Sequence, residues 1–137
     1  MILLDTSALV DLSLIELPDE PIVLSSISYA ELEFGVEAAA TDEHRRERTT
    51  RLAWIEANLG AEWLPFDVAA AQSYAKLAAR VAERRPAHAR SKDIMLAGHA
   101  HSLGARLMTF NAKDFELVAD QVEIVTPTLR VSGPTLR

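Results

Sequence analysis

The sequence predicts an α/β fold, with a mainly parallel five-stranded sheet flanked by helices. Two features lead to this prediction. Five short apolar segments are spread along the chain, and they are rich in residues that favour strands. Between most of them lie segments whose apolar residues recur at every third or fourth position, which indicates amphipathic helices. Strands that alternate with helices in this way are typical of a parallel sheet.

The expected elements follow one another along the whole chain. Strands are expected over residues 2–4, 22–24, 63–66, 106–109 and 122–125. Helices are expected over residues 8–15, 29–37, 41–59, 70–81 and 92–103. Gly60 and Gly104 follow two of these helices and are predicted to stop them. Residues 84–90 are expected to form a basic loop and residues 111–114 a polar turn.

The end of the chain shows no helical or strand periodicity. Pro127 stops the last expected strand, and the residues after it carry no regular apolar pattern. Terminal segments of this kind are commonly poorly ordered. We therefore expect a single domain over residues 1–126 and a loose C-terminal tail over residues 127–137.

Length and composition narrow the class of protein. A chain of 137 residues with 49% apolar and 25% charged residues fits one globular domain. The lack of cysteine excludes disulfides, thiolate zinc sites and cysteine nucleophiles. No apolar run approaches the roughly 18 to 20 residues that a membrane span needs. Asp5 interrupts the N-terminus before the apolar core of a secretory signal could form. We expect a cytoplasmic protein with no membrane partner.

The basic residues are gathered in two places, although the net charge of −6 is opposite to that of most nucleic-acid-binding proteins. The first basic cluster, which is expected to be a solvated helix face, comprises Arg45, Arg46, Arg48 and Arg51. The second basic cluster adjoins Asp93 and supplies candidate contacts to nucleic acid. It comprises Arg84, Arg85, Arg90 and Lys92.

Four carboxylates are expected to meet at one edge of the sheet. Asp5 and Asp114 come directly after strands, while Glu31 and Asp93 are expected in the first turns of helices. In a parallel sheet the strands end and the helices begin at the carboxyl edge, where ligands bind. The topology therefore predicts that these four side chains lie on one rim.

Three of the carboxylates also have a purely structural interpretation. Asp5 stands where a helix N-cap is expected, and the sequence leaves the cap and the catalytic interpretation equally open. Ser28 and Glu31 have the spacing of a capping box, in which the glutamate accepts from the N-cap N–H. Asp93 at a helix N-terminus would gain about 0.3 to 1 kcal/mol from the helix dipole without any catalytic role.

A rim of four carboxylates predicts a metal site. Like charges about 4 Å apart repel by about 4 kcal/mol at the effective dielectric of a protein surface, and a cation removes this repulsion. Oxygen ligands suit Mg²⁺ or Mn²⁺, which activate water and neutralise charge on a phosphoryl group. The predicted chemistry is phosphodiester hydrolysis. Flanking polar residues either hold the carboxylates in place or serve only in turns and caps: Thr6, Ser7, Thr109 and Asn111.

The four histidines are not expected to bind this metal. His99 and His101 lie two positions apart on one expected helix and point to different sides, so they cannot share an ion. His44 and His88 lie in charged segments, and both are expected to be solvated.

The carboxylates and their neighbours form four short motifs that resemble a known family. The motifs are Ile2-Leu3-Leu4-Asp5-Thr6-Ser7, Ala30-Glu31-Leu32 with Gly35, Asp93 with Leu96, Ala97 and Ala100, and Thr109-x-Asn111-x-x-Asp114-Phe115. In this order and spacing they resemble the PIN-domain ribonucleases, and more closely the VapC toxins of bacterial toxin–antitoxin modules. The resemblance covers nearly the whole expected domain, from residue 1 to about residue 125.

The resemblance implies both a fold and a function. It implies the strand order 3-2-1-4-5, a homodimer, Mg²⁺- or Mn²⁺-dependent endoribonuclease activity, and inhibition by a small cognate antitoxin that blocks the acidic pocket. By resemblance, the metal-binding acidic set is Asp5, Glu31, Asp93 and Asp114, and the supporting polar positions are Thr6, Thr109 and Asn111. Phe110 stands where the family often has Arg, which puts an RNA contact there in doubt. Gly98 stands where the family often has Ala and is expected only to loosen a helix.

Other enzyme classes fit the sequence poorly. A haloacid-dehalogenase-like phosphatase needs a second Asp two residues after the first, where this chain has Ser7. Retroviral aspartic proteases share a similar loop around Asp5, but their fold is all-β. The motifs of dinucleotide-binding and P-loop proteins are missing from the sequence. One alternative stays open, namely a non-catalytic PIN-fold interaction module that regulates an antitoxin-like partner or is regulated by it.

Overall fold

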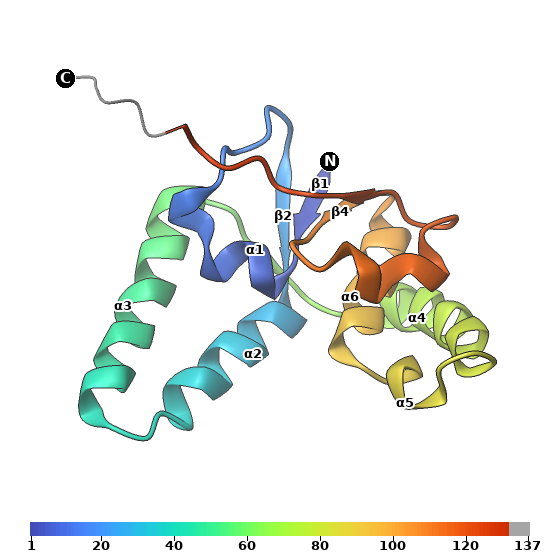
Figure 1. Cartoon of the computed structure of the whole chain (residues 1–137), viewed down its shortest axis with the longest axis horizontal. Helices are drawn as coiled ribbons and strands as arrows, with labels where there is room; N and C mark the ends of the chain where they lie inside the picture. Colours follow the sequence, from blue (N-terminus) through green and yellow to red (C-terminus); the bar gives the residue numbers. More distant parts are fainter. Residues whose placement is uncertain (132–137) are drawn as a thin grey trace.

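β1 (Ile2–Leu4) is the central strand of a five-stranded parallel sheet (Figure 1). It pairs with β2 (Ile22–Ser25) on one side and with β4 (Arg106–Met108) on the other. β3 (Trp63–Leu64) pairs with β2, and β5 (Ile124–Val125) pairs with β4. The structure is a computed structural model, and it describes residues 1–131. The order β3-β2-β1-β4-β5 confirms the predicted α/β fold and strand order.

Helices connect these strands through the described part of the chain. The α-helices are α1 (Thr6–Val10), α2 (Ser26–Glu37), α3 (Asp42–Leu59), α4 (Val68–Ala82), α5 (Pro86–Ala89) and α6 (Lys92–Leu103). Two 3₁₀ helices are present as well, η1 (Leu12–Leu14) and η2 (Ala112–Val118). Over residues 1–131, none of the helices has the length and apolar character that a bilayer span requires.

Several boundaries differ from the sequence predictions. The helix expected over residues 8–15 begins at Thr6 and is divided into α1 and η1. α2 begins at Ser26, three residues early, because the Ser25 hydroxyl caps it by accepting from the Ile27 N–H at 3.0 Å. The expected basic loop contains the short helix α5, and the expected polar turn opens η2. The predicted stops are confirmed, since Gly60 and Gly104 end α3 and α6 in the left-handed region, with φ of 58° and 67°.

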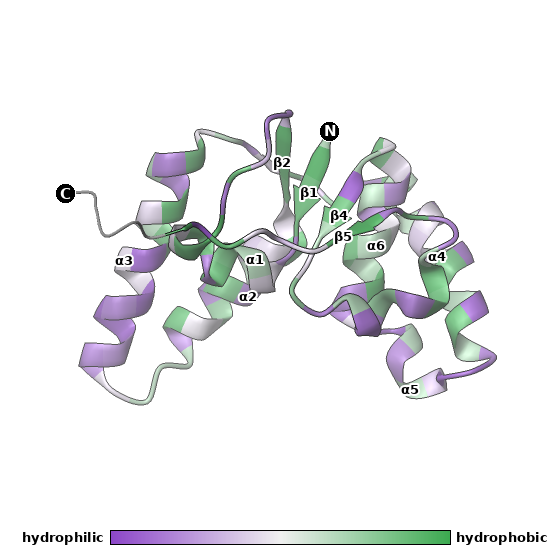
Figure 2. Ribbon diagram, turned by 45° about the horizontal axis from the view of Figure 1, so that its top comes forward, coloured by the Kyte–Doolittle hydropathy of each residue, from purple (hydrophilic) through white to green (hydrophobic). Residues whose placement is uncertain are grey.

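The two faces of the sheet are covered by different helices (Figure 2). Ile2 and Leu4 face α1, η1, α2 and α3, whereas Leu3 faces α4, α5, α6 and η2. This alternation follows from the two-residue period of a strand. All three residues are fully buried, as expected for the central strand of a parallel sheet covered on both faces. The sheet therefore holds β1 rigidly, and with it the first residue after the strand, Asp5.

α4 and α6 approach each other closely at Gly98. A Cβ atom added to Gly98 would lie 2.5 Å from the Cα of Tyr74, and 2.7 Å from the Cβ and the backbone N of the same residue. Only a glycine leaves room for the α4 backbone at this crossing. The expectation that Gly98 would merely loosen a helix is therefore wrong, because its missing side chain permits the packing of α6 against α4.

The first part of the expected loose tail is held against the domain. Leu129 forms an antiparallel bridge with Ile15. The Glu16 N–H donates to the Thr128 carbonyl at 2.7 Å, and the Arg130 N–H donates to the Leu14 carbonyl at 2.9 Å. The expectation of a loose tail is wrong for residues 128–130, because the backbone groups of residues 14–16 pair with them. Residues 132–137 lie outside the described part of the chain, and the domain boundary at residue 126 stays a prediction.

Candidate active site

Asp5 is buried where β1 passes into α1, and one of its oxygens caps that helix. Only 3% of the residue is exposed. Its Oδ1 accepts from the Ala8 N–H at 3.0 Å and from the Ser7 hydroxyl at 2.7 Å. Among the described residues, Oδ2 has no hydrogen-bond partner. The cap interpretation is thus correct for one oxygen, while the second oxygen stays available for a ligand.

Ser7 joins the ends of the two neighbouring strands β1 and β4. Its hydroxyl donates to Asp5, accepts from the Phe110 N–H at 3.1 Å, and lies 3.4 Å from the hydroxyl oxygen of Thr109. The Thr109 hydroxyl in turn accepts from the Asn111 N–H at 3.0 Å, and Thr109 is fully buried. Ser7 and Thr109 therefore fix the turn that follows β4 against the turn that follows β1. Asn111 takes part through its backbone.

Glu31 is held by Thr6 and not by a capping box. The Thr6 hydroxyl donates to Oε1 of Glu31 at 2.7 Å. Because α2 begins at Ser26, Glu31 lies in its second turn and Ser28 is not the N-cap, so the capping-box interpretation and the predicted first-turn position are wrong. Ser28 is fully buried, and its hydroxyl oxygen lies 3.1 Å from that of Thr6. The sequence analysis did not single out Ser28 as a site residue, because its spacing to Glu31 suggested a cap.

Asp93 carries the electrostatic signature of a shared acidic site. It lies in the first turn of α6, whose N-cap Ser91 accepts from the Ile94 N–H at 3.3 Å. Burial raises the pKa of the Asp93 carboxyl above its ordinary value, and the neighbouring charges of Asp114, Asp5 and Glu31 raise it further. Since charge interactions weaken with distance, all three other predicted carboxylates lie within electrostatic reach of Asp93.

Asp114 is fixed by a histidine that we expected to be solvated. His88 lies in α5, and its Nε2 is 2.7 Å from the backbone carbonyl oxygen of Asp114. This contact ties α5 to η2, and His88 is partly buried. The charge of His88 also lowers the pKa of Asp93, against the larger effect of burial. The expectation of a solvated His88 is wrong, because residues 86–89 fold back as a helix against the acidic rim.

A comparison with known families and solved structures is consistent with this geometry. The family model of the PIN domain matches residues 2–121. The chain belongs to the PIN-domain family. PIN domains are generally nucleases. Among curated proteins, none matches this sequence.

Solved PIN-domain structures from toxin–antitoxin complexes have the same fold. VapBC-5 of Mycobacterium tuberculosis, a member of the VapBC family of toxin–antitoxin systems, is 30% identical, with 92% of this chain and 96% of that chain covered and a TM-score of 0.67. DNA-bound VapBC of Salmonella typhimurium is 25% identical, with coverages of 91% and 96% and a TM-score of 0.66. VapBC2 of Rickettsia felis, bound to a promoter DNA fragment, is 22% identical, with coverages of 92% and 98% and a TM-score of 0.71, which shows the fold alone. The predicted resemblance to VapC-type PIN domains is confirmed.

The two basic clusters of this PIN domain have different surroundings. In the first, Arg48 donates to the Gly35 carbonyl at 2.6 Å and Arg45 donates to the Val36 carbonyl at 3.4 Å, so this cluster ties α3 to the end of α2 and is not simply a solvated face. The second cluster is exposed around α5, and within residues 1–131 its four residues form no ion pair. Beside it is a surface hollow of about 460 Å³, lined by Arg85, Pro86, Ala87 and His88.

The carboxylates of the rim are suitable ligands for a hard cation, but they do not lie close enough together to surround one. All four predicted ligands are carboxylates, which are the groups that Mg²⁺ and Mn²⁺ prefer. Within residues 1–131, no three Asp, Glu, His or Cys side chains stand close enough together to hold a metal ion. Mg²⁺ commonly binds through one or two carboxylates and keeps several waters. The donor chemistry therefore fits the predicted metal, although a closed set of protein ligands is not formed.

Proposed function

We propose that this PIN domain is a metal-dependent endoribonuclease that hydrolyses RNA phosphodiester bonds and acts as the toxin of a type II toxin–antitoxin module. The observation that carries the proposal is that Ser7 and Thr6 fix the carboxylates of Asp5 and Glu31 where their charges, with that of Asp114, add to the effect of burial in raising the pKa of Asp93. A set of interacting carboxylates beside an unpaired basic surface suits phosphate chemistry. The similarity to VapBC structures supports the toxin assignment. Cytoplasmic location stays a prediction.

In this proposal Asp5, Glu31, Asp93 and Asp114 would bind Mg²⁺, or Mn²⁺ in its place, one or two of them directly and the others through the waters that the ion keeps. Such an ion supplies an activated water and neutralises charge on the phosphoryl group. Thr6 orients Glu31 and Ser7 orients Asp5 through the hydrogen bonds described above. Thr109 and Asn111 support the turn that leads to Asp114. Each carboxylate that is hydrogen-bonded through one oxygen keeps its other oxygen for the ion or its waters.

The second basic cluster is proposed as the path of the RNA. These residues are exposed and flank α5, whose His88 contacts Asp114, and one of them directly precedes Asp93: Arg84, Arg85, Arg90 and Lys92. Lysine and arginine that contact phosphates release counterions, which makes binding depend on salt. Charge reversal at Arg85 and Arg90 should therefore weaken RNA binding and flatten its dependence on salt concentration. An unchanged salt slope would contradict this assignment.

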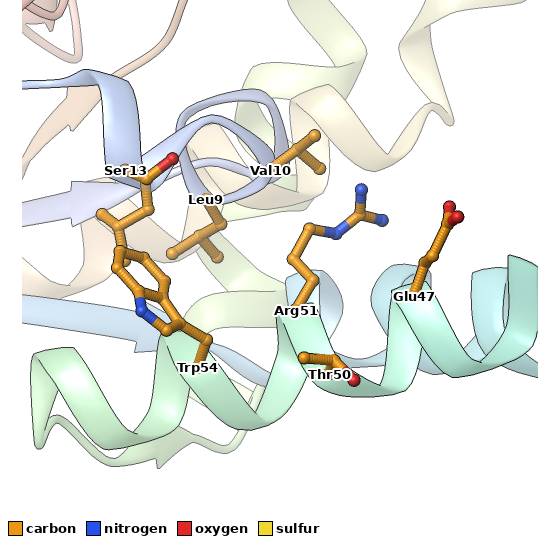
Figure 3. Close-up of a pocket in the computed structure, with 8 residues that line it drawn as sticks. Leu9, Val10, Ser13, Glu47, Thr50, Arg51 and Trp54 are labelled. Atoms are coloured by element: carbon orange, nitrogen blue, oxygen red, sulfur yellow. The ribbon is translucent and has the colours of Figure 1, made fainter.

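A small antitoxin is the proposed protein partner, and a hollow between α1, η1 and α3 is a surface that suits one. Figure 3 shows Arg51, Trp54 and Glu47 on α3 opposite Leu9, Val10 and Ser13. The hollow measures about 420 Å³, and Nε of Arg51 is buried in it without a hydrogen-bond partner among the described residues. Val10 and Trp54 are 37% and 40% exposed in this hollow, and exposed apolar side chains that lie together offer a surface to a partner. Trp54→Ser should weaken co-purification with a small protein expressed from the neighbouring reading frame.

The central experiment measures cleavage and metal binding together. Purified protein is incubated with a mixed RNA pool and Mg²⁺, alongside the Asp5→Asn variant. Metal-dependent cleavage that is absent from the variant supports the proposal, whereas equal cleavage by both would indicate a contaminating nuclease. Because binding to the folded state stabilises it, Mg²⁺ or Mn²⁺ should also raise the melting temperature. A melting temperature that does not respond to millimolar metal would count against the site.

The open arrangement of the carboxylates favours a second candidate function. Since no three ligands converge within residues 1–131, the second candidate is a non-catalytic PIN-fold module that regulates an antitoxin-like partner or is regulated by it. That function predicts partner binding with no RNA cleavage at any metal concentration. We also propose a homodimer, which light scattering on the purified protein tests.

A further inference from the structure

Phe34 is an exposed aromatic residue on the same side of α2 as Glu31. Its exposed fraction is 68%, which is unusual for a large apolar side chain. Residues three positions apart lie next to each other on the surface of a helix, so Phe34 and Glu31 project from neighbouring positions on one side of α2. The packing of the domain gives no reason for this exposure, because the apolar side of α2 is formed by Leu32 and Val36.

Lys92 approaches the same ring from a different helix. Its Nζ lies 6.0 Å from the centroid of the Phe34 ring, within the range of a cation–π interaction. Lys92 is the first residue of α6 and immediately precedes Asp93. It is exposed and forms no ion pair within the described residues. An aromatic ring and an ammonium group from two elements therefore meet at the rim of the acidic site.

We propose that Phe34 and Lys92 form a nucleotide-binding platform, in which the ring stacks on an unpaired RNA base and the ammonium contacts the adjoining phosphate. The inference rests on the nuclease function proposed above and extends it to a specific binding residue. An acidic rim repels the phosphate that it must cleave, so the substrate needs attractive contacts next to the rim. Stacking on an aromatic ring and pairing with a lysine supply both contacts without depending on base sequence.

The geometry also limits which nucleic acid can use the platform. A base can stack on a side chain only when it is free of its own neighbours, as in single strands and loops. A duplex has no such base to offer, and an abasic nucleotide has none at all. Binding that depends on Phe34 should therefore require a base next to the bound phosphate.

Equilibrium binding without metal tests the proposal separately from cleavage. The probe is a fluorescein-labelled single-stranded RNA of about 12 nucleotides, measured by anisotropy in EDTA. Phe34→Ala should weaken binding by roughly 5- to 150-fold, and Phe34→Trp should keep it near the wild-type value. The control is Val68→Ala, since Val68 is 73% exposed on α4 and belongs to neither the acidic rim nor the second basic cluster. Melting temperatures of all variants check that each is folded.

An otherwise identical RNA that is abasic at every position decides between stacking and other roles of the ring. Wild type should bind the abasic RNA as weakly as Phe34→Ala binds the normal RNA. The affinity of Phe34→Ala should be the same for the normal and the abasic RNA. Equal affinity of wild type and Phe34→Ala for normal RNA would overturn the proposal. Equal losses on normal and abasic RNA would also overturn it, as would a change of oligomeric state in Phe34→Ala with unchanged RNA affinity. If wild type binds neither RNA in EDTA, the platform proposal fails, whereas the nuclease function is tested separately by the cleavage assay with Mg²⁺ and the Asp5→Asn variant.

Discussion

Gly98→Ala should destabilise this protein although alanine is the better helix former. Replacing glycine inside a helix gains about 1 kcal/mol. At Gly98 the new Cβ would lie 2.5 Å from the Cα of Tyr74, so the backbone of α4 would have to move. Overpacking of this kind costs about 1 to 3 kcal/mol, and a contact to backbone atoms belongs at the upper end. The net loss is about 1 to 2 kcal/mol, which corresponds to a fall in Tm of roughly 3 to 10 °C.

Gly35→Ala is the matched control, because it makes the same change in another helix. A Cβ at Gly35 would meet only the Cδ of Arg48 at 3.9 Å, an ordinary contact. The Gly35 carbonyl that accepts from Arg48 is unchanged by the substitution. Its Tm should therefore stay the same or rise by a few degrees. Thermal unfolding followed by circular dichroism compares the two variants with wild type. A Tm of Gly98→Ala at or above the wild-type value would show that α4 and α6 are not in the close contact described.

Three further predictions concern charge and the end of the chain. The pKa of Asp93 is raised in the folded state, so its ionised form lowers the free energy of unfolding at a pH above that pKa. Without metal, Asp93→Asn should therefore have a higher Tm than wild type at pH 7. This gain should vanish below about pH 3.8, where the carboxyl is protonated in both the folded and the unfolded state. A gain independent of pH would exclude the electrostatic cause. Burial lowers the pKa of His99, so below pH 6.5 the unfolded state takes up a proton more readily than the folded state and the free energy of unfolding should fall. Urea unfolding at several pH values should show this fall in wild type but not in His99→Gln. Arg130 donates from Nε to the Ile15 carbonyl at 2.8 Å, and Arg130→Ala should lower the free energy of unfolding by about 1 kcal/mol; an unchanged urea midpoint would show that this contact does not matter.

Much of the fold follows from local patterns, whereas the roles of the candidate site residues stay predictions. The alternation of apolar runs with helical periodicity predicted the sheet, and the stops at Gly60 and Gly104 were correct because a left-handed C-cap is a local feature. The tail pairing and the role of Gly98 could not be predicted, since both depend on which backbone lies nearby in three dimensions. Glu31 was placed one turn early, because either Ser25 or Ser28 can cap a helix and only the length of β2 decides between them. His88 was missed for a similar reason, as its partner is a backbone carbonyl 26 residues away.

The single hydroxyl of Ser7 makes two distant parts of the polypeptide depend on each other. It has one proton, which it gives to Asp5, so the Thr109 hydroxyl must be the donor in the contact between them, 102 residues away. The relay therefore runs in one direction and ends on a carboxylate that only accepts. A relative without an oxygen at position 7 leaves two donors without their acceptor, the hydroxyl of Thr109 and the backbone N–H of Phe110. Because a substitution does not remove the Phe110 backbone N–H, only position 109 can change in concert with position 7: related sequences without a side-chain oxygen at position 7 should also lack the hydroxyl at position 109.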